Sequence, residues 1–242
     1  MVVADSSVLN VREIPQTRSS YARFKLAGDI VLSAVLLLPG LPVLLLLGIL
    51  VRLTSRGPAI FRQVRVGLNG RPFVLYKFRT MCHDAESRTG PVWAQRDDPR
   101  VTRFGGFLRR THLDELPQLF NVLRGDMCLV GPRPERPEFV SKLAAVIPGY
   151  LDRLSVRPGI TGLAQVYLPP DSDPESVQRK LSYDVYYVQF AGPVVDLKLL
   201  GCTALRLLGV PGWVAQRLVR LNRFVRPLWL RRARSAAVTA GK

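Results

Sequence analysis

The chain has 242 residues, of which 48% are hydrophobic, and a formal net charge of +17. A chain of this size and composition can bury one good core, so we expect a single catalytic domain with accessory segments. Its three cysteines lie far apart, and with only two histidines they form no plausible zinc site. No glycine-rich phosphate loop of the Walker or dinucleotide-binding type is present.

Residues 1–22 are predicted as a flexible N-terminal segment and residues 23–56 as a membrane segment. No residue from Ile30 to Val51 is charged, and a continuous helix over this run would be roughly 33 Å long, enough for a hydrocarbon core. The segment is too long and begins too late in the chain for a secretory signal peptide. Asp29, at its entrance, is interpreted as an interfacial or helix-start charge.

Both flanks of the membrane segment are basic. The residues concerned are Arg12, Arg18, Arg23 and Lys25 before it, and Arg52, Arg56, Arg62 and Arg65 after it. A spanning helix usually has one basic side, so we expect both ends in the cytoplasm, with the segment entering the membrane and turning back. Pro39 and Pro42 would supply the break. The alternative is a kinked transmembrane helix, because proline and glycine are tolerated there.

A β-hairpin is predicted after the membrane segment. Residues 59–66 and 72–78 are extended-looking runs, and the Asn69-Gly70 pair between them favours a tight turn. The second run leads into Lys77 and Arg79. Their charges either mark a solvent-facing edge or lie in a binding site.

Residues 83–100 are polar and are predicted as a mobile loop that covers a substrate. The segment Thr111–Asp126 predicts a helix whose first turn carries two adjacent carboxylates, Asp114 and Glu115. Its apolar residues repeat at helical spacing, and Gly125 stands where a helix would stop. The free N–H groups and the dipole at such a helix start favour anions.

From the residues alone, the paired carboxylates have two interpretations. Asp is a favoured N-cap and Glu is favoured in a first turn, so capping could explain the pair. A phosphate site is favoured by the arginines of the same segment, since a bidentate guanidinium matches phosphate oxygens. These are Arg109, Arg110, Arg124, Arg133 and Arg136. Arg133 lies in the rigid Gly131-Pro132-Arg133-Pro134, and Arg157, in a similar setting, is a second candidate for anion binding.

Helices are predicted over residues 174–190 and 194–208, and no carboxylate follows Asp196. Residues 209–242 form a basic amphipathic extension, which fits a helix lying on an anionic membrane surface. Each basic residue there would contribute on the order of 1 kcal/mol. Nucleic-acid binding requires the same charge, but no aromatic nucleic-acid motif is present and the apolar segment already supplies a membrane. We therefore expect no nucleic-acid partner.

Ten motifs in order resemble one family, the bacterial sugar transferases, which are monotopic phosphoglycosyl transferases. The resemblance covers about Phe24 to Leu208. The motifs are Phe24-Lys25 through Asp29, the apolar segment with its central proline, Phe61-Arg62-Gln63, Tyr76-Lys77-Phe78-Arg79-Thr80-Met81, Asp98-Pro99-Arg100, Leu113-Asp114-Glu115-Leu116-Pro117-Gln118-Leu119, Asn121-Val122-Leu123-Arg124-Gly125-Asp126-Met127, Gly131-Pro132-Arg133-Pro134, Arg157-Pro158-Gly159-Ile160-Thr161-Gly162 and Tyr183-Asp184-Val185-Tyr186-Tyr187.

The resemblance implies a reaction. Members transfer a sugar 1-phosphate from a nucleotide diphosphate sugar, here expected to be a UDP-sugar, to a polyprenyl phosphate such as undecaprenyl phosphate. This is the initiating step of exopolysaccharide, capsule, O-antigen or glycoprotein glycan synthesis. Asp114 would be the nucleophile that forms an aspartyl phosphosugar. Asp114 and Glu115 would hold Mg²⁺, for which Mn²⁺ could substitute. Lys77, Arg79 and three further cations, Arg109, Arg133 and Arg157, would bind the phosphates, and Asp184 is a further substrate-binding candidate.

The implied fold is mainly α with a small β-hairpin, in which a re-entrant membrane helix and amphipathic interfacial helices surround a cytoplasmic active site. Residues 57–208 would form the catalytic domain, on the cytoplasmic face of a bacterial inner membrane. The apolar C-terminal helices could support a homodimer. The competing hypothesis is a non-catalytic membrane-surface adaptor or polyprenyl-phosphate-binding protein.

The sequence departs from the family pattern at two positions. Leu41-Pro42, with an additional Pro39, stands where the family commonly has Ser-Pro at the membrane break. The bend keeps its prolines but loses a hydroxyl that could satisfy freed carbonyls. Gly106 stands where many members have a basic residue, so one phosphate or lipid contact would be absent.

Overall fold

The computed structural model describes residues 19–85, 90, 98–169 and 174–220. The predicted flexible segment before residue 19, most of the predicted substrate-covering loop and the C-terminal extension beyond residue 220 lie outside these residues. The helices (α), 3₁₀ turns (η) and strands (β) are α1 (Ser19–Thr54), β1 (Ile60–Val66), η1 (Leu68–Gly70), β2 (Pro72–Phe78), α2 (Arg103–Thr111), η2 (Leu113–Glu115), α3 (Gln118–Leu123), β3 (Cys128–Val130), α4 (Pro137–Val146), η3 (Tyr150–Ser155), β4 (Gly159–Thr161), α5 (Leu163–Tyr167), α6 (Pro174–Phe190), α7 (Pro193–Leu207) and α8 (Gly212–Leu218).

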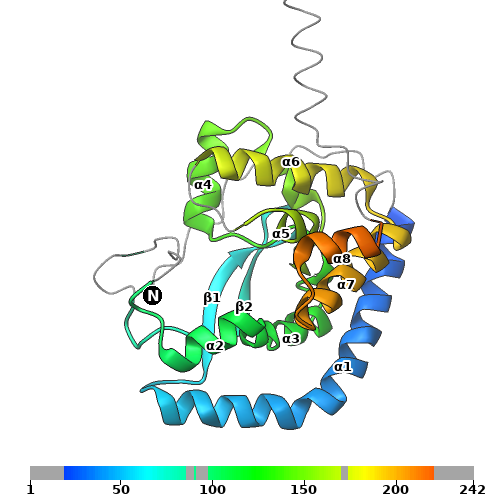
Figure 1. The fold of residues 1–242 in the computed structure, drawn as a ribbon. Helices are drawn as coiled ribbons and strands as arrows, with labels where there is room; N and C mark the ends of the chain where they lie inside the picture. The colour runs from blue at the N-terminus through cyan, green and yellow to red at the C-terminus, as the bar shows by residue number, and fades with distance from the viewer. Residues whose placement is uncertain (1–18, 86–89, 91–97, 170–173, 221–242) are drawn as a thin grey trace, which may run out of the picture.

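Helix α1 is a bent helix of 36 residues with two arms at a clear angle, as Figure 1 shows. It begins at Ser19, within the segment predicted to be flexible. Pro39 and Pro42 lie inside the helix, where proline removes a backbone hydrogen bond and its ring pushes the preceding turn away. By length and composition, the part from Tyr21 to Thr54 is a candidate membrane span. The predicted entry and return through one membrane face stays a prediction.

The first arm of α1 is fixed to the domain by buried polar contacts. Asp29 is only 8% exposed; it accepts a hydrogen bond from the backbone N–H of Leu129 at 3.0 Å and pairs with Lys25 at 2.9 Å. Lys25 also lies 2.7 Å from Asp196 at the start of α7. The interpretation of Asp29 as an interfacial or helix-start charge is therefore wrong. Its carboxylate instead joins α1 to β3.

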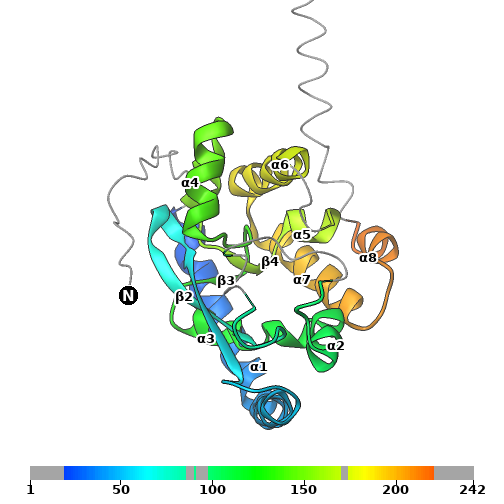
Figure 2. The same ribbon diagram turned by 90° about the vertical axis from the view of Figure 1, so that its left-hand side faces the viewer.

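The predicted hairpin is confirmed. Strands β1 and β2 are antiparallel, with Ile60 opposite Phe78 and Val66 opposite Pro72. Asn69 adopts the left-handed conformation, with φ of 53°, in the connecting turn, which asparagine tolerates better than most residues. Figure 2 shows the hairpin as a twisted ribbon that runs from α4 toward α1.

A second, parallel pair of strands was not predicted. Cys128 and Val130 of β3 lie opposite Gly159 and Thr161 of β4. A β-carbon on Gly159 would lie 2.0 Å from the backbone nitrogen of Gly131. Only glycine at position 159 therefore allows these two backbone segments to lie so close together. Strand β3 lies in the core and leads directly into the segment that carries Arg133.

The predicted helix over 174–190 is confirmed as α6, and α7 begins and ends one residue before the predicted 194–208. A mainly helical fold with a small hairpin and a long apolar N-terminal helix is thus confirmed. The largest core cluster joins α3, β3, α5 and α7 through Val122, Val130, Leu163 and Leu199.

Trp213 of α8 and Leu208 are exposed, but their contact with a membrane surface stays a prediction. The structure holds a single chain, so the homodimer also stays a prediction.

Candidate active site: paired carboxylates in a cationic cavity

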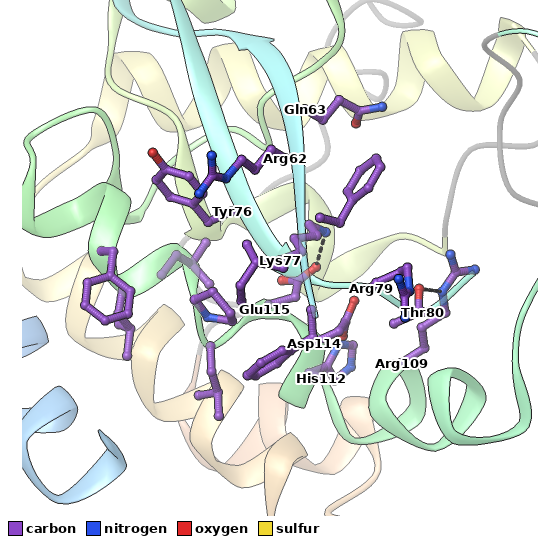
Figure 3. A pocket seen from close by; sticks show the side chains of 18 of the residues that line it. Arg62, Gln63, Tyr76, Lys77, Arg79, Thr80, Arg109, His112, Asp114 and Glu115 are labelled. Atoms are coloured by element: carbon purple, nitrogen blue, oxygen red, sulfur yellow. Dashed lines mark hydrogen bonds and ion pairs between the residues drawn. The ribbon is translucent and has the colours of Figure 1, made fainter. Parts of the chain in front are cut away.

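Asp114 and Glu115 line a cavity of about 2630 Å³. One wall is the apolar second arm of α1, and the others come from the hairpin, α3, α4, α5 and α7. Figure 3 shows the carboxylates below the end of β2, with cationic side chains on two sides. The cavity therefore combines an apolar wall with a charged centre.

The two carboxylates lie in η2, between α2 and α3. The prediction of one continuous helix from Thr111 is wrong, because His112 ends α2 in the left-handed conformation, with φ of 56°. Pro117 has no N–H to donate to the carbonyl of Leu113, and α3 begins only after it, at Gln118. Gly125, with φ of 76°, follows the end of α3 as predicted.

Helix α3 is held against the hairpin by Asn121, whose side chain is fully buried. Its amide group donates to the carbonyl of Val74 at 2.7 Å and accepts from the N–H of Tyr76 at 3.1 Å. The side chain thus continues the hydrogen bonding of β2 as another strand would. This clamp brings η2 next to Lys77 at the end of the hairpin.

Glu115 is paired with two cations. Lys77 Nζ lies 2.9 Å from Glu115 Oε1, and Arg133 Nη2 lies 2.5 Å from the same oxygen. Burial alone would raise the pKa of Glu115, but the charges of Arg133 and Lys77 outweigh burial and hold that pKa well below its ordinary value. Glu115 is therefore ionised and held in place at any pH near neutral.

Asp114 has a different environment. Its side chain is 7% exposed, and among the residues that the structure describes none donates a hydrogen bond to it. Burial raises its pKa, against the nearby charge of Lys77 and with the help of Glu115. Figure 3 shows the carboxylate between the Lys77–Glu115 pair and Arg109. Two adjacent carboxylates thus differ: one is neutralised by cations, and the other is available to a ligand.

Arg133 is positioned from behind the cavity wall. Its carbonyl accepts a hydrogen bond from Arg153 Nη2 at 2.8 Å, and Arg153 pairs with Asp184 at 2.7 Å. Asp184 is 1% exposed and does not line the main cavity. Asp184 was predicted to bind substrate, but it lies outside the cavity. It instead supports Arg133 indirectly, by pairing with Arg153.

The other predicted cations separate into two groups. Arg109 and Arg79 line the cavity; Arg109 Nε donates to Thr80 Oγ1 at 2.8 Å, and Arg79 Nη2 donates to the carbonyl of Ser55 at 2.7 Å. Arg157 does not line it, and its Nε donates to the carbonyl of Gly125 at 3.0 Å. The structure therefore brings Lys77, Arg79, Arg109 and Arg133 around the carboxylates but leaves Arg157 outside.

Asn121 and Arg100 occur in the motifs that carry the family resemblance, but the sequence assigns neither residue a role, and Arg153 lies in none of these motifs. Arg100 lines the cavity, and its guanidinium pairs with buried Asp98 at 2.6 Å. The local pattern does not show what these side chains contact. Their contacts depend on which strands and turns the fold places beside them.

The raised pKa of Asp114 predicts a specific pH dependence. If the ionised carboxylate reacts, kcat/KM for the phosphate-containing donor will fall on the acid side with a pKa above the ordinary carboxyl value. The folded protein binds this proton more tightly than the unfolded chain, so the free energy of unfolding should decrease as pH rises through the same window. Kinetics and thermal unfolding across pH measure the two effects. Asp114→Asn should remove this pH dependence of the free energy of unfolding. An acid limb at the ordinary carboxyl pKa would contradict this assignment.

A bent apolar helix that is a candidate membrane span thus lies beside a buried carboxylate pair whose neighbouring cations suit phosphate binding. The model of the family described as "Bacterial sugar transferase" matches residues 20–209. The chain therefore belongs to the bacterial sugar transferase family.

Three relatives illustrate the similarity. A Bacillus subtilis protein, provisionally named as an undecaprenyl-phosphate N-acetylgalactosaminyl 1-phosphate transferase, is 51% identical over 141 residues, which are 58% of this chain and 78% of the relative. The UDP-N-acetylgalactosamine-undecaprenyl-phosphate N-acetylgalactosaminephosphotransferase of Aeromonas hydrophila is 46% identical over 170 residues, 70% of this chain and 40% of the relative. The UDP-glucose:undecaprenyl-phosphate glucose-1-phosphate transferase of Klebsiella pneumoniae is 41% identical over 185 residues, 76% of this chain and 40% of the relative. The chain thus matches less than half the length of the last two.

Proposed function

We propose that this chain transfers a sugar 1-phosphate from a UDP-sugar to undecaprenyl phosphate, giving undecaprenyl diphosphate sugar and UMP. The named relatives carry out this type of transfer. The observation that supports it best is Asp114, a buried carboxylate beside Lys77, Arg133 and Arg109 with no hydrogen bond from the described residues. In the cell this would be an initiating step of exopolysaccharide or related glycan synthesis.

In the first half of the reaction, an oxygen of Asp114 attacks the phosphorus that bears the sugar. A P–O bond forms to Asp114, the bond to the UMP oxygen breaks, and UMP leaves with that electron pair. The carboxylate approaches a negatively charged diphosphate, so cations must offset the repulsion. Lys77, Arg133 and Arg109 surround Asp114 and would provide this compensation.

In the second half, a phosphate oxygen of undecaprenyl phosphate attacks the same phosphorus. A new P–O bond joins the two phosphates, and the bond to Asp114 breaks to return its carboxylate. Glu115 keeps Lys77 and Arg133 in place throughout, because both cations contact its oxygens.

Mg²⁺ is the proposed cofactor, with Mn²⁺ as a substitute. No group of three or more His, Cys, Asp or Glu side chains that could hold a metal occurs in the described part of the chain. An adjacent carboxylate pair fits an ion that takes its remaining ligands from water and substrate phosphates, as Mg²⁺ does. Asp114 and Oε2 of Glu115 would hold it, because Lys77 and Arg133 make their short contacts with Oε1 of Glu115. When bound, the ion would neutralise negative charge on the phosphates.

A donor screen tests the proposal. Purified protein is incubated with undecaprenyl phosphate, Mg²⁺ and a panel of nucleotide diphosphate sugars, and release of nucleoside monophosphate is measured. We expect release with at least one UDP-sugar, dependent on undecaprenyl phosphate for turnover and lost with EDTA. Release that persists in EDTA would reject the metal, and no release from any donor would reject the reaction.

The proposed location is the cytoplasmic membrane, with the cavity on the cytoplasmic face and α1 re-entrant. In a variant whose exposed Cys82 is replaced by serine, cysteines introduced by Ser7→Cys and Arg71→Cys should both react with an impermeant thiol reagent only after the cell is opened. The two positions flank α1. If they react from opposite sides of the membrane, α1 spans it and the re-entrant assignment is wrong.

A further inference from the structure

We propose that Arg79 and Arg52 bind the phosphate of the polyprenyl phosphate acceptor, and that the cavity-lining face of α1 binds its hydrocarbon chain. This inference rests on the proposed function and deepens it. It assigns the acceptor a cationic subsite of its own, apart from the cations that hold Glu115.

Arg79 is a buried cation without an anion. It is 7% exposed. Within the described part of the chain, its side chain donates hydrogen bonds from Nη2 to the carbonyl of Ser55 at 2.7 Å and to Ser55 Oγ at 2.8 Å. Its Nε and Nη1 have no hydrogen-bond partner among the described residues. Leaving a guanidinium buried in this state is costly, and an entering anion would reduce the cost.

The surroundings of Arg79 add positive charge. Burial and the nearby charge of Arg52 both lower the pKa of Arg79, and no acidic side chain pairs with it in the described part of the chain. Gly57 packs close to Nη1: a β-carbon at Gly57, where φ is 108°, would lie 2.3 Å from that nitrogen and 2.4 Å from His83 Cδ2. Arg79 and His83 both line the cavity, so a phosphate that enters the cavity has Arg79 in its wall.

The two cationic groups lie on different sides of the reacting carboxylate. Lys77 and Arg133 are bound to Glu115, whereas Arg79 makes no contact with either carboxylate. Figure 3 draws Arg79 beside Thr80 and Arg109, across Asp114 from the Lys77–Glu115 pair. In the second half-reaction, the acceptor phosphate must bind next to the phosphorylated Asp114. Arg79 lies on the side of Asp114 away from the Lys77–Glu115 pair, which is where we place this phosphate.

The apolar wall of the cavity leads to this cation. Leu37, Leu41, Leu44, Gly48 and Arg52 line the cavity, and their spacing puts them on one face of α1. Gly40 lies on the same side, where an added β-carbon would have no neighbour within 4 Å. The face is thus apolar along its length and ends at Arg52, close to Arg79.

The occupant that fits is a long-chain phosphomonoester. Its hydrocarbon matches the leucine-lined face, and its doubly charged head matches two arginines at the end of that face. A UDP-sugar is polar along its whole length and would leave the apolar face without a partner. A bilayer phospholipid has similar chemistry, so the experiment must separate the two lipids.

The test measures the two half-reactions separately. Exchange of labelled UMP into UDP-sugar needs no acceptor, whereas full transfer does. For Arg79→Ala and Arg79→Lys we expect KM for undecaprenyl phosphate to rise about 10- to 100-fold, more for Ala, with exchange within twofold of the native rate. Arg103→Ala, an exposed arginine that does not line the cavity, is the matched control and should change neither.

The apolar face has its own matched pair. Leu41→Trp fills the cavity side of α1, whereas Leu38→Trp changes a residue that is 72% exposed and does not line the cavity. Only Leu41→Trp should raise KM for undecaprenyl phosphate, and the rise should shrink when a short-chain polyprenyl phosphate is the acceptor. An equal effect of both variants would reject the chain-binding face.

Three results would overturn the Arg79 assignment. Equal losses of exchange and transfer would place Arg79 on the donor. An unchanged KM for the acceptor in a folded Arg79→Lys variant would remove it from the site. Weaker binding to phosphatidylglycerol vesicles with an unchanged KM would make it a general lipid contact. If the native protein itself shows neither exchange nor transfer, the proposed function fails instead.

Discussion

Asp114→Asn is expected to abolish sugar-phosphate transfer, with a loss on the order of 10³-fold or more. The amide keeps the shape of the carboxylate but cannot act as the nucleophile. Exchange of UMP into UDP-sugar should disappear together with transfer, and mass spectrometry of native protein incubated with UDP-sugar should detect a phosphosugar adduct that the variant lacks. Transfer at the native rate would reject the covalent mechanism.

The same substitution should not harm the fold. It removes a buried charge that receives no hydrogen bond from the described residues, so the variant should unfold at the same temperature as the native protein or a higher one. Asp152→Asn, outside the cavity lining, is the matched control and should retain activity. If the native protein binds undecaprenyl phosphate without turning it over, the chain is a membrane adaptor or lipid-binding protein rather than an enzyme.

Asp184→Asn is expected to lower the free energy of unfolding by about 3 kcal/mol. Asp184 and Arg153 are 2% and 3% exposed at their side chains and lie 2.7 Å apart, so removing the carboxylate leaves a buried guanidinium without its counter-charge. For a chain of this length the melting temperature should fall by roughly 6–12 °C. Thermal unfolding in detergent or nanodiscs measures the shift.

Glu138→Gln provides the comparison for Asp184→Asn. The Arg136–Glu138 pair is 3.5 Å apart, and Glu138 is 49% exposed, so this change should alter stability by less than about 0.5 kcal/mol. At a temperature where Asp184→Asn remains folded, KM for the UDP-sugar should stay within a few-fold of native. A large rise in KM without loss of stability would instead support the predicted substrate contact of Asp184.

Local sequence determines much of this protein. Asn69-Gly70 sets the hairpin turn, because these residues accept the backbone conformation of a tight connection. Gly125 ends α3 for a similar reason, and the apolar periodicity over residues 174–190 predicts α6 with both bounds correct. The charge-free run from Ile30 to Val51 and its internal prolines predict a long bent helix. Each of these features depends on neighbours within a few residues, and sequence alone therefore suffices.

The site required the tertiary structure. The residues alone identify Asp114 and Glu115 as a pair, and only the family resemblance gives them different roles. Their physical difference comes from Lys77 and Arg133, which other segments bring into contact with Glu115 and not with Asp114. Arg133 and Arg157 have similar local sequences, yet only Arg133 lines the cavity.

The sequence likewise predicted a substrate contact for Asp184 and an interfacial or helix-start charge for Asp29. In the fold, both carboxylates are buried, Asp184 beside Arg153 and Asp29 beside Lys25. Burial and the charge of distant partners determine whether an ionisable group binds a ligand or stabilises the fold, and both are properties of packing. The sequence alone thus determined the family, the hairpin and the long helices α1, α6 and α7, and it singled out the carboxylate pair. Only the tertiary structure decided which carboxylate is paired with cations and which arginines line the cavity.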